Sequence, residues 1–283
     1  MLLDRLLSHI PQLLIFLDTQ KLIKYVAIGF AFILIFGIIS SILFGLNSLF
    51  GIIDNNKDGI KNMEVVNISD SVNVLDIEVD KVNLKIKTGD TLRVELDRDS
   101  RISYNDNGNR LVIKENKLNL FADVEDVIIY VPSSMEWEKV LIETGAGMLD
   151  VEELVTDKLE LELGVGSVLF NNLNVSKTAS IDTGVGKFIL SRSVINNLEL
   201  DMGLGDVILE AKVLGKSEVN AGVGKLDLDL VGESGDYTID IDEGIGSVLG
   251  DGKKLIEKGP YGSGNNYIEI DGGIGECNIN FVD

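Results

Sequence analysis

Apolar and polar residues alternate strictly in several short segments of the chain. The clearest are KLELEL at 158–163, NNLELDM at 196–202 and KLDLDL at 225–230. A period of two places successive side chains on opposite faces of a strand, and it does not suit an amphipathic helix. Residues 62–140 contain similar segments, among them VNVLDIEV, TLRVEL and VIIYVP. The pattern therefore predicts an all-β fold from residue 62 to the C-terminus.

Residues 25–50 differ because they form one apolar run without a charged residue, YVAIGFAFILIFGIISSILFGLNSLF. A helix that spans a bilayer needs about 20 apolar residues, so the run predicts a single transmembrane helix within residues 21–53. The alternative is a cleaved signal peptide, but such a peptide has a shorter apolar core of about 7–15 residues and a small-residue cleavage site. Lys21 and Lys24 precede the run, whereas Asp54 and Asp58 follow it. This asymmetry favours a cytoplasmic N-terminus and an extracytoplasmic C-terminal domain in a cell membrane.

The segments around this helix divide by composition. Residues 1–20 combine leucines with few charges and Pro11, so we expect either a cytoplasmic, interfacial helix or an unstructured tail. We expect residues 54–61 to be a linker. Residues 62–140 are expected to form a β-rich, membrane-proximal cap, with Asn107-Gly108 as a hairpin turn, and a separate small β-domain is the alternative.

A Gly-x-Gly pair recurs through the C-terminal half at steps of 19, 20, 19, 19, 22 and 29 residues. The pairs are Gly145/Gly147, Gly164/Gly166, Gly184/Gly186, Gly203/Gly205, Gly222/Gly224, Gly244/Gly246 and Gly273/Gly275. A fixed period of this size indicates stacked structural units, each too small to bury its own apolar face. The residues five before, one before and two after each second glycine are all apolar, as in Leu161, Val165 and Val168. The position two after the second glycine is an odd number of residues from the other two, so in a regular strand its side chain would point to the opposite face. The chain is therefore expected to turn a corner at the glycines.

These units predict a β-solenoid over residues 141–283, in which equivalent strands of successive repeats pair in parallel. Thirty glycines against three prolines fit a chain with many bends. The net charge of −21 falls entirely on residues 61–283, because residues 1–60 hold four basic and four acidic residues. Such a domain is expected to repel nucleic acid and anionic lipid, so its partners should be basic, cationic or neutral.

One acidic position repeats with the glycines. Four residues before each second glycine stand Glu143, Glu162, Asp182, Asp201, Asn220, Asp242 and Asp271. Stacked strands lie about 4.8 Å apart, so these side chains should form a ladder in which neighbouring carboxylates repel by about 1 kcal/mol. Two interpretations remain open. The six carboxylates bind a row of divalent cations or a basic partner, or they form a solvated face that keeps strand edges from aggregating.

The other motifs of the chain do not indicate a nucleotide, metal or catalytic site. The Gly-x-Gly pairs run into strands, whereas a dinucleotide-binding fingerprint needs a third glycine and a helix. The position after the glycines lacks the regular aspartate of calcium-binding nonapeptide repeats. Cys277 falls on an inward position, and His9 precedes the apolar run, so neither indicates a metal or catalytic site. With Arg192 as the one arginine of the repeats, we expect no enzyme activity and no cofactor.

The segment VIIYVPSSMEWEKVLIETGAGMLDVEEL at 127–154, with LELELGVGSVLF and IDTGVGKFIL after it, resembles the bacterial DUF4097 family of candidate adhesins. The resemblance covers residues 65 to 283 and rests on Val131-Pro132 and on the corners Thr144-Gly145 and Thr183-Gly184. It implies β-strand repeats, an N-terminal membrane helix and no catalytic residues to carry over. Some members resemble accessory proteins of envelope-stress systems.

We therefore expect a non-catalytic, membrane-anchored module in the bacterial cell envelope that binds or scaffolds a cell-wall, matrix or membrane-protein partner. The alternative is an accessory or regulatory subunit of an envelope-stress or membrane signalling complex. An adhesin-like module should bind as an isolated ectodomain, whereas a regulatory subunit should need its membrane helix.

Overall fold

A computed structural model of the chain describes residues 62–116, 124–242, 244–251, 253–254 and 260–283. The expected interfacial segment 1–20, the transmembrane helix at 21–53 and the linker 54–61 lie outside these residues. None of the helices in the described ranges is long and apolar enough to cross a bilayer.

The described part is all-β, as the alternation predicts, apart from one short 3-10 helix, η1 (Ser234–Asp236). The strands are β1 (Met63–Asn67), β2 (Val74–Gly89), β3 (Arg93–Asp97), β4 (Ile102–Asp106), β5 (Arg110–Glu115), β6 (Glu125–Pro132), β7 (Trp137–Val151), β8 (Leu154–Phe170), β9 (Leu173–Asp182), β10 (Val185–Asn196), β11 (Leu198–Asp201), β12 (Leu204–Leu214), β13 (Lys216–Asn220), β14 (Val223–Val231), β15 (Tyr237–Asp242), β16 (Ile245–Gly250), β17 (Lys253–Lys254), β18 (Tyr261–Gly262), β19 (Asn266–Asp271) and β20 (Ile274–Val282).

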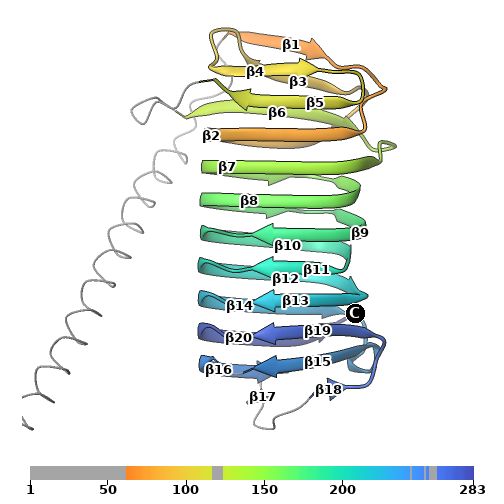
Figure 1. Cartoon of the computed structure of the whole chain (residues 1–283), viewed down its shortest axis with the longest axis vertical. Helices are drawn as coiled ribbons and strands as arrows, with labels where there is room; N and C mark the ends of the chain where they lie inside the picture. Colours follow the sequence, from red (N-terminus) through yellow and green to blue (C-terminus); the bar gives the residue numbers. More distant parts are fainter. Residues whose placement is uncertain (1–61, 117–123, 243, 252, 255–259) are drawn as a thin grey trace, which may run out of the picture. The chain divides into compact units, whose positions relative to one another are not determined.

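Most of these strands stack in layers joined by parallel ladders (Figure 1). β2 pairs with β7, and β7 pairs with β8 along almost its whole length. Beyond β8 the ladder on one side runs through β9, β11 and β13, and the ladder on the other side runs through β10, β12 and β14. We call one turn of chain around the stack a layer, for example β13 with β14.

The glycine pairs lie where the chain passes from one side of the stack to the other, and they are in register between layers. Gly205 pairs with Gly186 on one side and Gly224 on the other, and its φ is +135°. A Cβ atom on Gly205 would lie 1.9 Å from the carbonyl oxygen of Gly186. Only glycine allows this close approach together with this backbone conformation.

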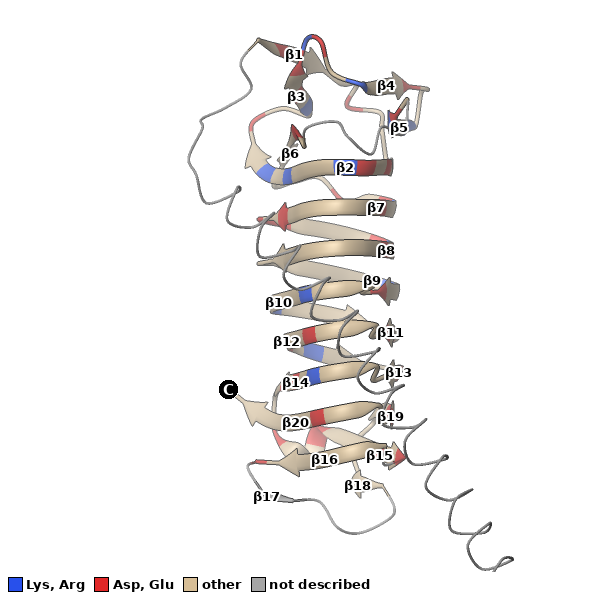
Figure 2. Ribbon diagram, turned by 90° about the vertical axis from the view of Figure 1, so that its left-hand side faces the viewer, with Lys and Arg blue, Asp and Glu red and all other residues tan. Residues whose placement is uncertain are grey.

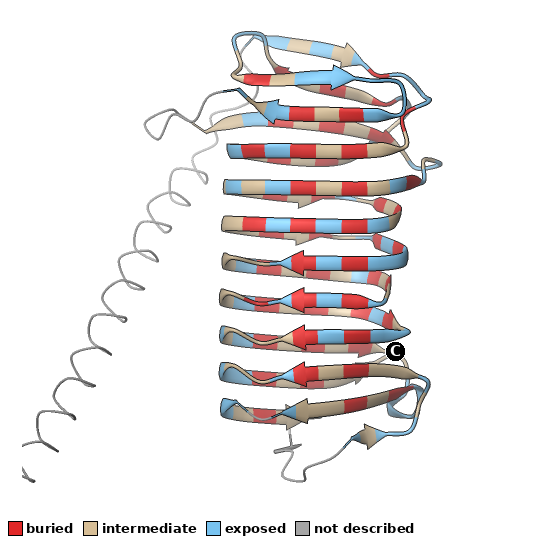
Figure 3. Cartoon of the chain, viewed as in Figure 1, coloured by how far each residue is buried: buried red, intermediate tan, exposed pale blue. Residues whose placement is uncertain are grey.

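Buried and exposed residues alternate along the strands, which gives the banding of Figure 3. Ile181 before the glycines is 1% exposed, and Phe188 after them is 2% exposed. These two buried positions are seven residues apart, an odd number, so the chain changes face between them. The buried residues of all layers belong to one continuous apolar core.

The N-terminal end of the stack is closed by antiparallel strands. β5 and β6 pair in parallel with the first and second halves of β2. The antiparallel strands then follow, because β4 pairs with β5, β3 with β6 and β1 with β3. Gly108, with φ +75°, lies in the turn between β4 and β5, so the predicted Asn107-Gly108 hairpin is present. This end shares the core of the repeats.

The C-terminal end differs from the simple expectation that successive repeats are neighbours. β20 pairs with β14 on one side and with β16 on the other, and β19 likewise pairs with β13 and β15. The last repeat of the sequence is therefore inserted between the two repeats that precede it (Figure 1). The short antiparallel strands β17 and β18 pair with β16 and β15.

The apolar residue between the two glycines is more exposed than the alternation along the preceding strand predicts. The side chains of Val223, Ile274 and Ile245 are 37%, 52% and 72% exposed. This residue sits on the outside of the corner, where the backbone bends away from the core, so its side chain cannot follow the parity of the preceding strand.

Candidate functional site: an acidic face

The predicted carboxylate ladder lies in register on one face of the stack. Its members pair in the order Glu78, Glu143, Glu162, Asp182, Asp201, Asn220, Asp271 and Asp242. Glu78 of β2 extends the ladder by one layer, and Asp271 precedes Asp242 because the last repeat is inserted. All of these residues are exposed except Asn220, which is half-buried.

A second row runs beside the ladder, two residues earlier in each strand. It contains Glu160, Ser180, Glu199, Glu218, Glu269 and Asp240, paired in this order. We did not predict this row from the sequence, although most repeats carry an acidic residue six positions before the second glycine. We call the ladder and the second row together the acidic face.

Few basic groups neutralise the acidic face. Lys139 forms an ion pair with Glu160 at 2.8 Å between Nζ and Oε1, and Lys114 forms one with Glu78 at the N-terminal end of the ladder. Within the ladder, the Asn220 amide donates to Asp201 Oδ1 at 2.7 Å. An uncharged asparagine next to an aspartate replaces a repulsive carboxylate pair by a hydrogen bond, which relieves the ladder at that layer.

The corner side of the stack shows a different arrangement of charge. The residue just after the glycines is Lys187 in β10, Asp206 in β12, Lys225 in β14 and Glu276 in β20, and these residues are cross-strand neighbours in that order. Figure 2 shows the resulting bands of alternating sign. Opposite charges on adjacent strands attract, so this row compensates itself. The acidic face has few counter-charges by contrast, although the same fold accommodates lysines in an equivalent row.

The ladder carboxylates follow one another along the stack and are not gathered around a common point. Within the described ranges, no group of three His, Cys, Asp or Glu side chains is placed to hold a metal ion. A calcium ion takes about six to eight oxygen ligands, so a pair of carboxylates would leave most positions to water. A cation row on Glu143, Glu162, Asp182, Asp201, Asp242 and Asp271 stays a prediction.

A buried carboxylate closes the corner of the first layer. In the repeats, the N–H group between the two glycines donates to a glycine carbonyl of the neighbouring layer, as Leu204 does to Gly184 at 2.8 Å. Lys81 occupies the equivalent place in β2, where its N–H donates to Glu115 Oε2 at 3.0 Å. The carboxylate thus replaces the carbonyl of a missing layer.

Charge and burial act in opposite directions on this carboxylate. Burial by itself raises the pKa of Glu115, but the N–H groups of Lys81 and Asp80 and the Arg101 guanidinium bring the pKa below its ordinary value. The Arg101 Nε lies 3.1 Å from Oε1. Glu115 is therefore ionised and structural at neutral pH.

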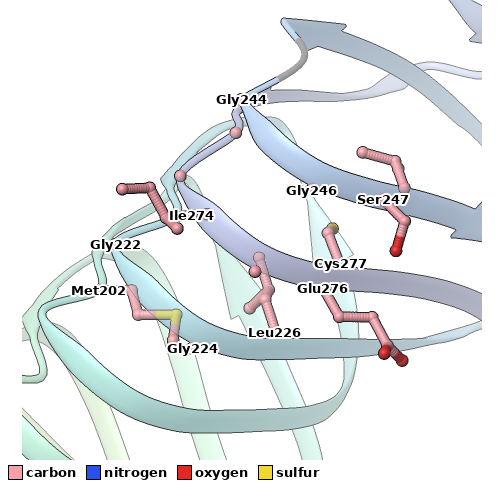
Figure 4. A pocket seen from close by; sticks show the side chains of 15 residues that line it. Met202, Gly222, Gly224, Leu226, Gly244, Gly246, Ser247, Ile274, Glu276 and Cys277 are labelled. Atoms are coloured by element: carbon pink, nitrogen blue, oxygen red, sulfur yellow. The ribbon is translucent and has the colours of Figure 1, made fainter. Parts of the chain in front are cut away.

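Cys277 lies inside the stack and lines a small cavity of about 40 Å³ at the C-terminal corner. Figure 4 shows its side chain near Leu226 of the neighbouring strand β14, with Met202 of the next layer lining the same cavity. The inward corner residues become smaller toward this end, from Met202 through Ala221 to Gly272, which leaves the gap. Burial raises the pKa of the Cys277 thiol to about 12. The cavity is far smaller than the roughly 300 Å³ of a typical ligand site, so it is a packing gap beside an inert thiol.

The comparison with protein families agrees with this architecture. The profile of the Toastrack family, DUF4097, matches residues 62–248, which is more than half of the chain. The chain belongs to the Toastrack DUF4097 family. The match extends from β1 into β16, so the antiparallel end and most of the stacked layers are both part of the Toastrack domain.

Several solved structures are similar to this Toastrack chain. A candidate cell adhesion protein from Clostridium sporogenes ATCC 15579 is 14% identical, with a TM-score of 0.31 and coverage of 78% of this chain and 99% of the other. A candidate lipid-binding protein from Parabacteroides distasonis ATCC 8503 is 16% identical, with a TM-score of 0.45 and coverage of 80% and 99%. A candidate adhesin from Bacteroides fragilis NCTC 9343 is 15% identical, with a TM-score of 0.34 and coverage of 77% and 95%. No curated protein matches the chain.

Proposed function

We propose that this Toastrack protein is a non-catalytic binding or scaffold module of the bacterial cell envelope, adhesin-like in action, which presents its acidic face to a cationic partner. The observation that carries the proposal is the contrast between two rows of the same stack. The corner row alternates Lys187, Asp206, Lys225 and Glu276, whereas the acidic face repeats carboxylates over successive layers with few counter-charges.

The energetics support a binding role for this contrast. Each pair of adjacent carboxylates costs about 1 kcal/mol in water, and the cost rises near a protein surface. A row of alternating sign avoids that cost, as the corner row does. Repeated carboxylates on a rigid stack instead produce a field that attracts a cationic partner and guides its approach.

The setting of this module is part of the proposal. The uncharged run at residues 25–50 supports a single-pass membrane anchor, and the lysines before it support an extracytoplasmic position for residues 62–283. Each Gly-x-Gly repeat of 19–20 residues then corresponds to one turn of a β-solenoid that projects the acidic face from the membrane. A cell-wall or matrix component, or a basic segment of a membrane protein, is the class of partner that this arrangement suits.

The test compares cells that carry the full-length chain with cells that carry a neutralised variant. Glu199, Glu218 and Glu269 are neighbours in the second row, and Glu199→Gln, Glu218→Gln and Glu269→Gln remove three charges without changing size. The matched control removes three carboxylates away from the acidic face, through Asp150→Asn, Glu153→Gln and Glu210→Gln.

The measured quantity is retention of the cells on a poly-lysine surface and on purified cell wall. We expect retention to weaken about tenfold in the first variant, because three contacts of about 0.5 kcal/mol are lost, and to stay unchanged in the control. Equal loss in both variants would reduce the effect to net charge and refute a dedicated face. Retention that needs residues 1–60 and follows a co-purified membrane protein would instead support a regulatory subunit.

The divalent-cation version of the proposal has its own measurement. If calcium bridges adjacent ladder carboxylates, the melting temperature of the protein rises on adding millimolar calcium and returns to its starting value with a chelator. A melting temperature that is independent of calcium and magnesium rejects cation binding and leaves the basic partner.

A further inference from the structure

The last two layers of the stack are out of chain order, and they make equivalent backbone hydrogen bonds at the glycine corner. The N–H group between the glycines of β19 and β20 belongs to Ile274 and donates to the Gly222 carbonyl at 2.8 Å. The equivalent N–H group of the next layer belongs to Ile245 and donates to the Gly273 carbonyl, also at 2.8 Å. If the inserted layer were absent, the Ile245 N–H group could therefore donate to the Gly222 carbonyl in the same way.

The side chains inside the stack also suit both orders. In the observed order, Val219 packs in register with Ile270, and Leu226 with Cys277. If β15 and β16 lay directly on β13 and β14 with the glycines in register, Ile241 would face Val219 and Val248 would face Leu226. These neighbours are apolar. The buried Ser217 of β13, which lies beside Ile268 in the observed order, would lie beside Ile239 instead, so its apolar setting would not change.

Two features favour the observed order. β20 pairs with all nine residues of β14, whereas β16 has only six residues before the chain turns at Asp251. The Asn278 amide donates to Asp227 Oδ1 at 2.7 Å, and the Asn280 amide donates to Asp229 Oδ1 at 2.8 Å. The inserted layer thus supplies a full-length ladder and two amide donors that β16 lacks.

The outermost layer is able to move as a unit. β17 pairs with β16 through Leu249 and Gly250, and β18 pairs with β15 through Thr238 and Ile239. The inner edges of β15 and β16 are the ones that pair with β19 and β20. Removing the inserted layer therefore breaks none of the contacts with β17 and β18, and the shift that closes the gap is one strand spacing of about 4.8 Å.

We propose that residues 266–282 form an exchangeable layer, and that the stack has a second, closed arrangement in which β15 and β16 pair directly with β13 and β14. Because far fewer residues separate β14 from β15 than from β19, the closed arrangement has the lower loop-closure cost and forms first during folding. The layer of β19 and β20 then inserts and gains the longer ladder and the asparagine contacts. The two arrangements differ in which strand lies beside β14.

Two cysteine pairs report which strand is the neighbour, in full-length protein with Cys277→Ala. Asp227 and Asn278 are adjacent in the observed order, so Asp227→Cys with Asn278→Cys is placed to form a disulfide. Asp227 and Leu249 are two strands apart, at about 9.6 Å, and become neighbours only in the closed arrangement. Asp227→Cys with Leu249→Cys therefore reports closure.

Gly275→Val is the perturbation, because a Cβ atom there would lie 1.8 Å from the Gly224 carbonyl oxygen and the φ of Gly275 is +145°. We expect oxidation of the Asp227/Asn278 pair in the parent protein to be lost in Gly275→Val, and the Asp227/Leu249 pair to become oxidised instead. Persistence of the first disulfide, or formation of neither in a variant that folds, would overturn the proposal.

A second measurement needs no glycine substitution and covers the case in which Gly275→Val does not fold. The full-length protein with the Asp227/Leu249 cysteine pair is diluted from urea, and an oxidant is added after different delays. The proposal predicts that the disulfide forms at early delays and declines as the last layer inserts. Its absence at every delay would overturn the proposal.

Discussion

The close stacking of glycines makes a sharp prediction for Gly205→Ala. The new Cβ atom would lie 1.9 Å from the carbonyl oxygen of Gly186, about 1 Å closer than real contacts of this kind, so the two layers must separate. The φ of +135° adds strain for any residue with a side chain. Strain of about 1–3 kcal/mol and the loss of a few ladder hydrogen bonds of about 1 kcal/mol each give a destabilisation of about 3–5 kcal/mol.

Gly108→Ala is the matched control for this prediction. Gly108 also has a positive φ, +75°, but a Cβ atom there would meet nothing within 4 Å. Its substitution should cost about 1 kcal/mol from backbone strain alone. Urea unfolding followed by circular dichroism measures both variants. Equal shifts in the unfolding midpoint would refute the argument that close packing between layers, rather than backbone conformation, requires the glycines.

Three further predictions concern single residues. Asn220→Asp should destabilise the protein by about 1–2 kcal/mol in low salt. The substitution removes the hydrogen bond to Asp201 and places a carboxylate between those of Asp201 and Asp271. In a thermal melt, 1 M salt should restore part of the lost stability. Cys277, whose pKa is raised to about 12, should react with a thiol reagent at pH 8 only after unfolding, and rapid labelling of native protein would contradict its burial. Glu115 has a folded pKa below its unfolded value of about 4.3, so its stabilisation is full above that pH and is lost as the pH falls through the folded pKa. Glu115→Gln should therefore cost about 1–3 kcal/mol at pH 7 and progressively less in acid, as pH-dependent urea unfolding would measure.

Much of this fold is contained in local sequence signals. Strict alternation in segments such as KLELEL predicts the strands, and the odd spacing of Ile181 and Phe188 across a glycine pair predicts a change of face. The ladder from Glu143 to Asp201 follows from the same register. These features depend only on the period of the chain, so the sequence is sufficient to place them.

The order of the last layers could not be predicted in this way. The edge of β14 offers the same glycines to either β16 or β20, so the repeat pattern does not distinguish them. The choice depends on strand length and on the amide contacts of Asn278 and Asn280 with a strand some 51 residues earlier. The exposure of Ile245 escaped prediction for a related reason, because parity along a strand does not describe a residue at a bend.

Treating intact cells with a protease tests the central claim of an envelope-exposed binding module most directly. The cells carry the full-length protein, and an antibody against the C-terminal residues 266–283 reports its integrity. The account predicts that the C-terminal signal is lost from intact cells while a cytoplasmic marker survives. Survival of the C-terminal signal until the membrane is permeabilised would contradict the account, because the acidic face would then lie inside the cell.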